Sequence, residues 1–183
     1  PPFSTPPPAS EIGYRLVGSE MCRRDRLAKA RGAYVVGVTA PAKVEALRRI
    51  GADDAISRSQ IGSLTANGYD VVIDLVAGPS WASLLNALRP GGRYAVSGAI
   101  GGPIVELDIR TLYLKDLSFY GCTVLDEGVF ANLVRLIEGG RVKPLVAETF
   151  PLRDIARAQA SFQAKKHVGK IVMQVAGPEG QAR

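Results

Sequence analysis

Residues 69–99, YDVVIDLVAGPSWASLLNALRPGGRYAVSGA, have the pattern of a strand, a helix and a second strand, and this unit decides the fold class. The nearly continuous apolar run over residues 71–76 is typical of a parallel strand covered on both faces. Pro79 predicts the beginning of a helix, one face of which carries the apolar residues Trp81, Leu84, Leu85 and Leu88. The helix is expected to end at residues 90–92 (PGG), and the next strand to begin at Tyr94. The unit therefore predicts an open α/β sheet of parallel strands.

A sheet of this kind binds its ligand beyond the carboxyl ends of its strands. In this unit those ends are residues 76–78 (VAG) and residues 97–99 (SGA). Small residues let a ligand approach the backbone closely, although a tight turn between strand and helix would also favour glycine here. We predict a binding site that includes Val76, Ser97, Gly98 and Ala99.

Length and composition restrict the class of protein. The chain has 183 residues, enough for one domain or for one domain with part of another. No apolar run approaches the roughly 20 residues that span a membrane, so we expect no membrane partner. Residues 1–10 lack the basic start and apolar centre of a signal peptide. The first residue is not methionine, which we take to indicate a fragment of a longer protein.

The charge and the cysteines exclude two further classes. A formal net charge of +6 and a pI near 9.6 would suit nucleic-acid binding. However, the basic residues are spread through every segment without interleaved aromatic residues, so we expect no nucleic-acid partner. Cys22, Cys122 and the single histidine, His167, do not have the spacing of zinc ligands, and no zinc is expected. An α/β pattern without an export signal favours reduced thiols and a cytoplasmic location.

The rest of the chain continues the alternation of strands and helices. Further strands are expected over residues 33–38, 53–57 and 117–123, with helices over residues 41–50 and 127–138. Asp126 is the predicted N-cap of the last of these helices, and residues 101–117 are expected to be extended. Beyond Pro144 the pattern predicts a strand, a helix and a strand over residues 145–150, 152–165 and 168–175.

Six segments in succession resemble the medium-chain dehydrogenase/reductase superfamily, in particular its zinc-independent, quinone-oxidoreductase-like branch. They are VTAPAKVEALRRIGADDAI, YDVVIDLVAG, LRPGGRYAVSGAIGG, RTLYLKDLSFYGCT, LVRLIEGGRVKPLVAETFPL and HVGKIVM. The resemblance covers roughly four-fifths of the chain. The resemblance implies a Rossmann-like doubly wound parallel sheet that binds NAD(P)H. It also implies a terminal strand-helix-strand that returns to a catalytic domain absent from this sequence.

The resemblance divides the chain into four parts. Residues 27–140 would form an incomplete Rossmann domain, residues 141–177 the returning segment, and residues 178–183 a tail. The family's first strand and glycine fingerprint are missing or replaced, because GSEMCRRDR stands in the place of the glycine-rich turn. Residues 12–17 are a candidate for the vacant strand, since Ile12, Tyr14 and Leu16 alternate. We hypothesise that the Pro-rich residues 1–26 are disordered or not native to the gene.

Three residues are candidates for contact with a coenzyme phosphate. An NAD-binding sheet usually ends its second strand with an acid that binds the ribose, whereas this chain has Thr39 there and Lys43 one turn later. In the family these positions contact the 2′-phosphate of NADP, and Arg58 lies where relatives face the adenosine phosphate. The alternatives are an N-capping threonine, a solvated lysine and a surface arginine.

The remaining candidates surround the nicotinamide end of the coenzyme. By resemblance, Cys122 belongs to a segment whose backbone meets the nicotinamide amide, and Lys170 lies at the coenzyme cleft. We expect Cys122 to be a small buried residue and not a nucleophile, and His167 to be a surface residue. Asp74, inside a buried strand, is expected to bond to backbone or to a neighbouring helix. Trp81 is expected in the core, and no catalytic residue is assigned.

The sequence leaves three functional hypotheses. The resemblance implies an NADP(H)-dependent oxidoreductase, with NAD(H) possible, that transfers hydride to a small quinone, alkenal or carbonyl substrate. Its full-length relatives would form homodimers through the edge strand at residues 117–123. The alternatives are an S-adenosylmethionine-dependent methyltransferase, which also contains strand-helix-LRPGG-strand units, and a truncated product without catalytic activity.

Overall fold

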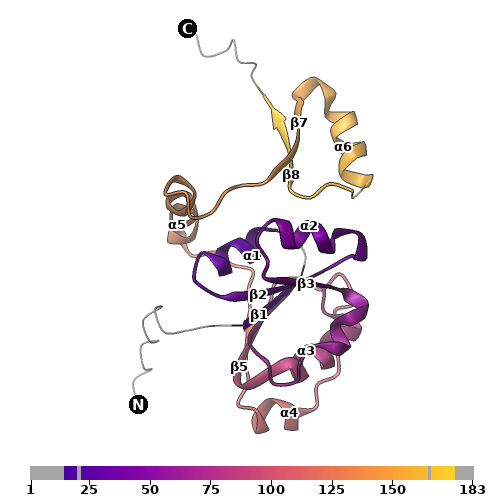
Figure 1. The fold of residues 1–183 in the computed structure, drawn as a ribbon, viewed down its shortest axis with the longest axis vertical. Coiled ribbons are helices and arrows are strands. Elements are labelled where there is room, and N and C mark those ends of the chain that lie inside the picture. The colour runs from indigo at the N-terminus through magenta and orange to yellow at the C-terminus, as the bar shows by residue number, and fades with distance from the viewer. Residues whose placement is uncertain (1–14, 20–21, 165, 176–183) are drawn as a thin grey trace.

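We describe the protein from a computed structural model, in which residues 15–19, 22–164 and 166–175 are described. Its main body is a six-stranded sheet in the order β3-β2-β1-β4-β5-β6, and all its paired strands are parallel (Figure 1). The strands are β1 (Arg15–Ser19), β2 (Tyr34–Thr39), β3 (Asp54–Ser57), β4 (Tyr69–Asp74), β5 (Leu88–Val96) and β6 (Ser118–Gly121). This order confirms the predicted Rossmann-like parallel α/β fold.

Helices cover both faces of this sheet. One face carries α1 (Cys22–Lys29) and α2 (Val44–Arg49), and the other carries the 3-10 helix η2 (Arg58–Ser63) and α3 (Trp81–Ala87). Neighbouring strand residues divide between the faces, because Val35 packs with Ala28 of α1 whereas Val36 packs with the η2 and α3 cluster. The apolar runs of β2 and β4 are therefore buried from both sides, as their composition predicts.

The central position of the sheet, expected to be vacant or replaced, is filled by β1. Leu16 lies opposite Val35 of β2 and Val71 of β4, so both neighbouring strands find hydrogen-bonding partners. Without β1, the inner edges of β2 and β4 would be left unpaired in the middle of the sheet. The sheet thus begins before residue 27, and its first strand lies further along than residues 12–17. Residues 12–14 are outside the described residues.

Two expected elements differ in the structure. The helix that was expected to reach residues 90–92 ends at Ala87, and β5 already begins at Leu88 opposite Tyr69. An irregular register between β4 and β5 accommodates Pro90, which has no backbone N–H to donate. Within the stretch 101–117 that was expected to be extended, α4 (Ile109–Leu114) forms. Its N-cap, Asp108, accepts a hydrogen bond from the Arg110 backbone N–H at 2.9 Å.

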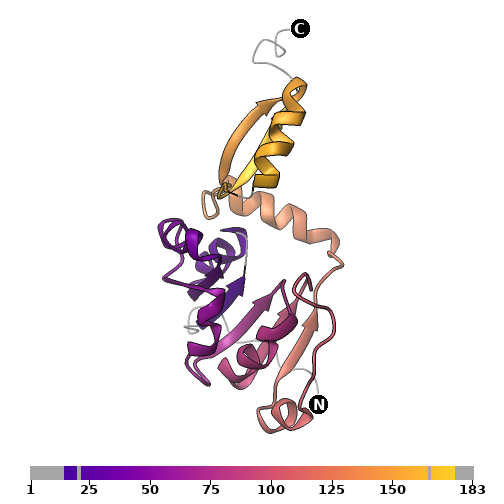
Figure 2. The ribbon, with the colours of Figure 1, turned by 90° about the vertical axis from the view of Figure 1, so that its right-hand side faces the viewer.

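The returning segment forms a second unit with its own small sheet. It follows α5 (Glu127–Glu138) and consists of β7 (Val146–Pro151), the 3-10 helix η4 (Leu152–Asp154), α6 (Ile155–Ala164) and β8 (Lys170–Gln174). Figure 2 shows α6 lying against the parallel β7–β8 pair. Asp126 stands at the predicted N-cap of α5 but makes no side-chain capping bond. Among the described residues, no helix has the length and apolar character needed to cross a membrane.

Candidate coenzyme site

The carboxyl ends of the strands bring most of the predicted site residues to one edge of the main sheet. Because the strands are parallel, their exits share this edge, which we call the carboxyl edge. It receives the predicted residues Thr39, Arg58, Val76, Ser97, Gly98, Ala99 and Cys122. Lys170 comes from elsewhere, as the first residue of β8 in the second sheet.

Asp74 organises the exit of β4. Its carboxylate is 2% exposed and accepts hydrogen bonds from the backbone N–H groups of Val76, at 2.8 Å, and Ala77, at 3.1 Å. The Tyr94 hydroxyl from β5 donates a third hydrogen bond. Burial, and then the bond to Asp74, raises the pKa of the Tyr94 phenol, which keeps this donor protonated. The predicted bonding of Asp74 to backbone is confirmed, while its side-chain partner is on a strand and not on a helix.

The exits of β4 and β5 pack closely through their glycines. The Gly101 N–H donates to the Val76 carbonyl at 2.7 Å, and a Cβ built on Gly78 would overlap the Gly101 carbonyl. A Cβ on Gly98 would lie 2.8 Å from the Leu75 carbonyl oxygen. Ala77 has a positive φ of 53°, which is uncommon for a residue other than glycine. These exits therefore form a fixed ledge of backbone with few side chains.

The end of β2 carries a threonine and a lysine but no acid. Thr39 is 5% exposed and pairs with Ser57 at the end of β3. Lys43 ends the 3-10 helix η1 (Pro41–Lys43), and its Nζ donates to the His167 carbonyl at 3.2 Å. Lys43 thus binds the returning segment at His167, which precedes Lys170, the first residue of β8, by three positions.

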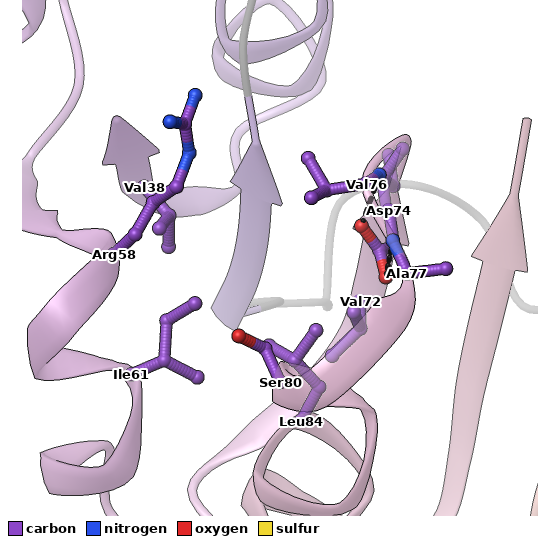
Figure 3. A pocket seen from close by; sticks show the side chains of 10 residues that line it. Val38, Arg58, Ile61, Val72, Asp74, Val76, Ala77, Ser80 and Leu84 are labelled. Atoms are coloured by element: carbon purple, nitrogen blue, oxygen red, sulfur yellow. Dashed lines mark hydrogen bonds between the residues drawn. The ribbon is translucent and has the colours of Figure 1, made fainter. Parts of the chain in front are cut away.

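A small cavity lies under the carboxyl edge between β2, β4, η2 and α3. It has a volume of about 30 Å³, and its apolar lining includes Val38, Ile61 and Leu84. Figure 3 shows Arg58 at its rim, with the guanidinium directed toward the carboxyl edge and away from Ile61. The cavity is large enough for about one water molecule, so it is an apolar hollow below the edge and not an enclosed ligand pocket.

Three other predicted side chains can now be placed. Cys122, expected to be buried, is exposed, because it follows the last residue of β6 and leaves the sheet there. His167, expected at the surface, is half-buried; its Nδ1 is inaccessible and its ring centroid lies 5.8 Å from that of Phe162. Trp81 packs against the core as expected, with its ring centroid 4.7 Å from that of Tyr94.

Sequence reasoning missed the contact between Lys43 and His167 and the role of Tyr94. No local signal links Lys43 to His167, because a backbone carbonyl far along the chain accepts the bond. A signal for Tyr94 did exist: a tyrosine in a strand beside a buried aspartate is a suitable donor for it.

A structural metal ion needs several ligands close together. Within residues 15–19, 22–164 and 166–175, no group of three or more His, Cys, Asp or Glu side chains could hold one. These residues do not fit a zinc centre.

Comparisons with known proteins agree with this geometry. Residues 26–139 match the family described as zinc-binding dehydrogenase. An NAD-dependent alcohol dehydrogenase from Saccharolobus solfataricus is 31% identical, over 81% of this chain and 45% of the relative. An acryloyl-coenzyme A reductase from Sulfurisphaera tokodaii is 29% identical, also over 81% and 45%. A solved thermostable alcohol dehydrogenase from Pyrobaculum aerophilum, with cobalt and zinc bound, is 30% identical with a TM-score of 0.75, over 89% of this chain and 51% of that one. The chain thus spans about half the length of these relatives.

Proposed function

This chain belongs to the zinc-binding dehydrogenase family, and from that premise we propose that it is the coenzyme-binding half of an NADP(H)-dependent oxidoreductase. The substrates proposed for the whole enzyme are small quinones, alkenals or other carbonyl compounds. One observation carries the proposal: the rigid backbone ledge at the exits of β4 and β5 lies on the same edge of the sheet as a β2 end without an acid. A bound coenzyme would supply the hydride, and the chain would bind and orient it.

The ledge and the apolar hollow fit the two ends of a dinucleotide. Gly78 and Gly98 let the exits of β4 and β5 pack tightly against the backbone of the neighbouring exit, which fixes the course of the edge. Ser97 and Ala99, at the exit of β5, are exposed there and would face a flat ring system. Val38 and Ile61, in the hollow, would lie beneath the adenosine, and Val76 would lie at its side. The nicotinamide would then extend toward residues 97–99 and the backbone around Cys122.

The preference for NADP(H) over NAD(H) rests on Lys43. Its ammonium has three N–H donors, of which the His167 carbonyl takes one. Two N–H donors of Lys43 are left for a 2′-phosphate. The Thr39 hydroxyl and the Arg58 guanidinium, from the ends of β2 and β3, would contact the same phosphate. A carboxylate at the end of β2, which would repel that phosphate, is absent from the YVVGVT strand. The NAD-dependent relative does not decide this point, because the chain's own residues set the preference.

An energy-transfer titration tests the proposal. Trp81, the single tryptophan, begins α3 just beyond the exit of β4, so a reduced nicotinamide bound at the ledge should quench its emission. Lys43→Met should weaken NADPH binding about tenfold, because one charge-assisted hydrogen bond contributes about 1.5–3 kcal/mol. NADH binding should change little.

The matched control is Arg153→Met, which removes an exposed cation of η4 that is not at the carboxyl edge of the main sheet. This variant should bind NADPH as the wild type does. Equal losses for NADPH and NADH in Lys43→Met would contradict the NADP assignment. Binding of S-adenosylmethionine in place of either dinucleotide would support the methyltransferase alternative instead.

The partner of the complete enzyme is also a proposal. β6 is the outer strand of the main sheet, and among the described residues only β5 pairs with it. Tyr120 on β6 is 49% exposed, and Tyr113 on the preceding helix is 59% exposed. We propose that two copies pair along residues 117–123, because an unpaired edge with apolar side chains favours strand addition. Sedimentation of Tyr120→Lys should show a monomer where the wild type is a dimer; equal masses would contradict this interface.

A further inference from the structure

A groove with several basic residues lies on the far side of the main sheet from the carboxyl edge. Helix α1 runs back from the exit of β1, so its last residue, Lys29, lies near the amino ends of the strands, as does the end of α2. Residues 140–145 pass beside these two helix ends on their way from α5 to β7. Between them is an open groove of about 540 Å³, which we call the basic groove. Its volume is within the range of small-molecule sites, about 300–1,000 Å³.

Four cationic side chains line the basic groove: Arg26, Lys29, Arg141 and Lys143. The Lys29 ammonium is neutralised by Asp53, with Nζ–Oδ distances of 2.7 and 2.8 Å. Arg141 uses one nitrogen, Nη2, to donate to the Ala30 carbonyl at 2.6 Å, which leaves its charge without an acidic partner. In the part of the chain that the structure describes, Lys143 likewise has no ion pair. Arg141 and Lys143 therefore add positive charge to the groove that Asp53 does not balance.

The two cations of the connecting segment are held in position by a buried residue between them. Val142 is 5% exposed, and its backbone N–H donates to the Leu136 carbonyl at 3.1 Å. The Arg141 N–H donates to the same carbonyl at 2.9 Å. With Val142 buried, Arg141 and Lys143 stand on either side of a fixed anchor. The backbone that carries both cations is therefore fixed, which lowers the conformational freedom lost when an anion binds between them.

The ends of α1 and α2 explain part of this charge. Carbonyl groups at a helix C-terminus favour cations, and Arg141 satisfies one of them at Ala30. This effect does not require Lys143, which stands on the opposite side of Val142 and donates to no carbonyl in the described residues. Ile50 and Leu145 add an apolar wall to the groove. No aromatic side chain lines it, which is unlike the stacking surfaces that bind single-stranded nucleic acids.

We propose that the basic groove is a second anion site that binds a small ligand with two or more phosphate groups. Lysine and arginine together provide many N–H donors to phosphate oxygens, and closely spaced phosphates would engage Arg26, Arg141 and Lys143 at once. Clefts with one sign of charge raise the local concentration of the opposite ion. The proposal does not depend on the coenzyme function, because the groove lies on the opposite edge of the sheet.

Calorimetric titration with inorganic tripolyphosphate at low salt tests the site. The wild type should bind one equivalent, and Lys143→Gln and Arg26→Gln should each weaken binding about tenfold, since each removes a charge-assisted contact. The control, Arg153→Gln, removes an exposed cation of η4 that does not line the groove, and it should leave the affinity unchanged. Thermal unfolding checks that all variants are folded.

Three results would overturn the proposal. The first is no binding by the wild type. The second is an equal loss in all three variants, which would indicate attraction to the overall positive charge alone. The third is a loss of tripolyphosphate affinity in Lys43→Met, which would place the anion at the carboxyl edge. Failure of the proposed coenzyme function would give a different result, because NADPH would then not bind at all. The comparison of tripolyphosphate affinities among the groove variants would still test the basic groove.

Discussion

Replacing Asp25 with asparagine should stabilise the protein at neutral pH and remove much of its loss of stability between about pH 4 and pH 7. Asp25 is in α1 and is 5% exposed. Burial raises the pKa of its carboxyl from 3.8 to about 6, although the neighbouring Arg24 and Arg26 partly oppose this shift. The folded state therefore holds the Asp25 proton more tightly than the unfolded state does.

The sign and size of the change in unfolding free energy follow from the difference between the folded and unfolded pKa of Asp25. A carboxyl whose pKa is raised on folding stabilises the protein fully below the unfolded pKa, and this contribution is lost as the pH rises through the folded pKa. One pKa unit corresponds to about 1.4 kcal/mol, so the shift from 3.8 to about 6 corresponds to about 3 kcal/mol. At neutral pH the ionised Asp25 carboxylate should cost the folded protein roughly that much. Asparagine keeps the shape and removes the charge, so Asp25→Asn should recover part of it.

Urea unfolding at several pH values measures this effect. The difference in unfolding free energy between Asp25→Asn and the wild type should grow from about pH 4 and level off above about pH 7. Glu138→Gln, which removes an exposed carboxylate at the end of α5, is the control and should follow the wild-type pH dependence. If the Asp25→Asn and wild-type curves ran parallel over this range, the reasoning from burial would be wrong.

Three further changes test other parts of the structure. Tyr94→Phe removes a donor from the buried Asp74 carboxylate and should cost about 1–3 kcal/mol in urea unfolding; an unchanged midpoint would show that the bond contributes nothing. Gly78→Ala places a Cβ against the Gly101 carbonyl at a φ of +71°, which should distort the ledge. NADPH binding in the Trp81 assay should therefore weaken while far-UV circular dichroism changes less. Undiminished NADPH binding would argue against the ledge. Lys115→Met removes an ammonium that donates to two carbonyls at the end of α3, at 3.0 and 3.1 Å, and should lower thermal stability by about 1 kcal/mol; an equal melting temperature would contradict this.

The sequence predicted correctly the strands and helices whose apolar pattern is complete within a few residues. The apolar run of β4, the helical face of α3 and the position of Asp126 before α5 are all visible over a few residues, and the structure confirms them. The family relationship is confirmed as well, because the match over residues 26–139 covers the first four of the six segments that carry the resemblance.

The sequence predictions were wrong where a residue far along the chain determines the structure of a segment. The strand that begins at Leu88 contains a proline and two glycines, which read locally as a helix stop, but pairing with β4 makes them part of β5. The exposure of Cys122 depends on where β6 leaves the sheet. Short-range patterns carry no information on either point, because both depend on which strands become neighbours.

The sequence by itself determined that parallel strands and covering helices alternate, and that the strand exits would lie at one edge of the sheet. This is possible because periodicity in apolar residues is a local property that each element expresses before it packs. Only the tertiary structure decided that Arg15–Ser19 completes the centre of the sheet and that Tyr94 satisfies Asp74. It alone also brought His167 to Lys43 and Arg141 to the end of α1. Those contacts join residues far apart in the chain, so they exist only once the sheet has set the distances between its helices.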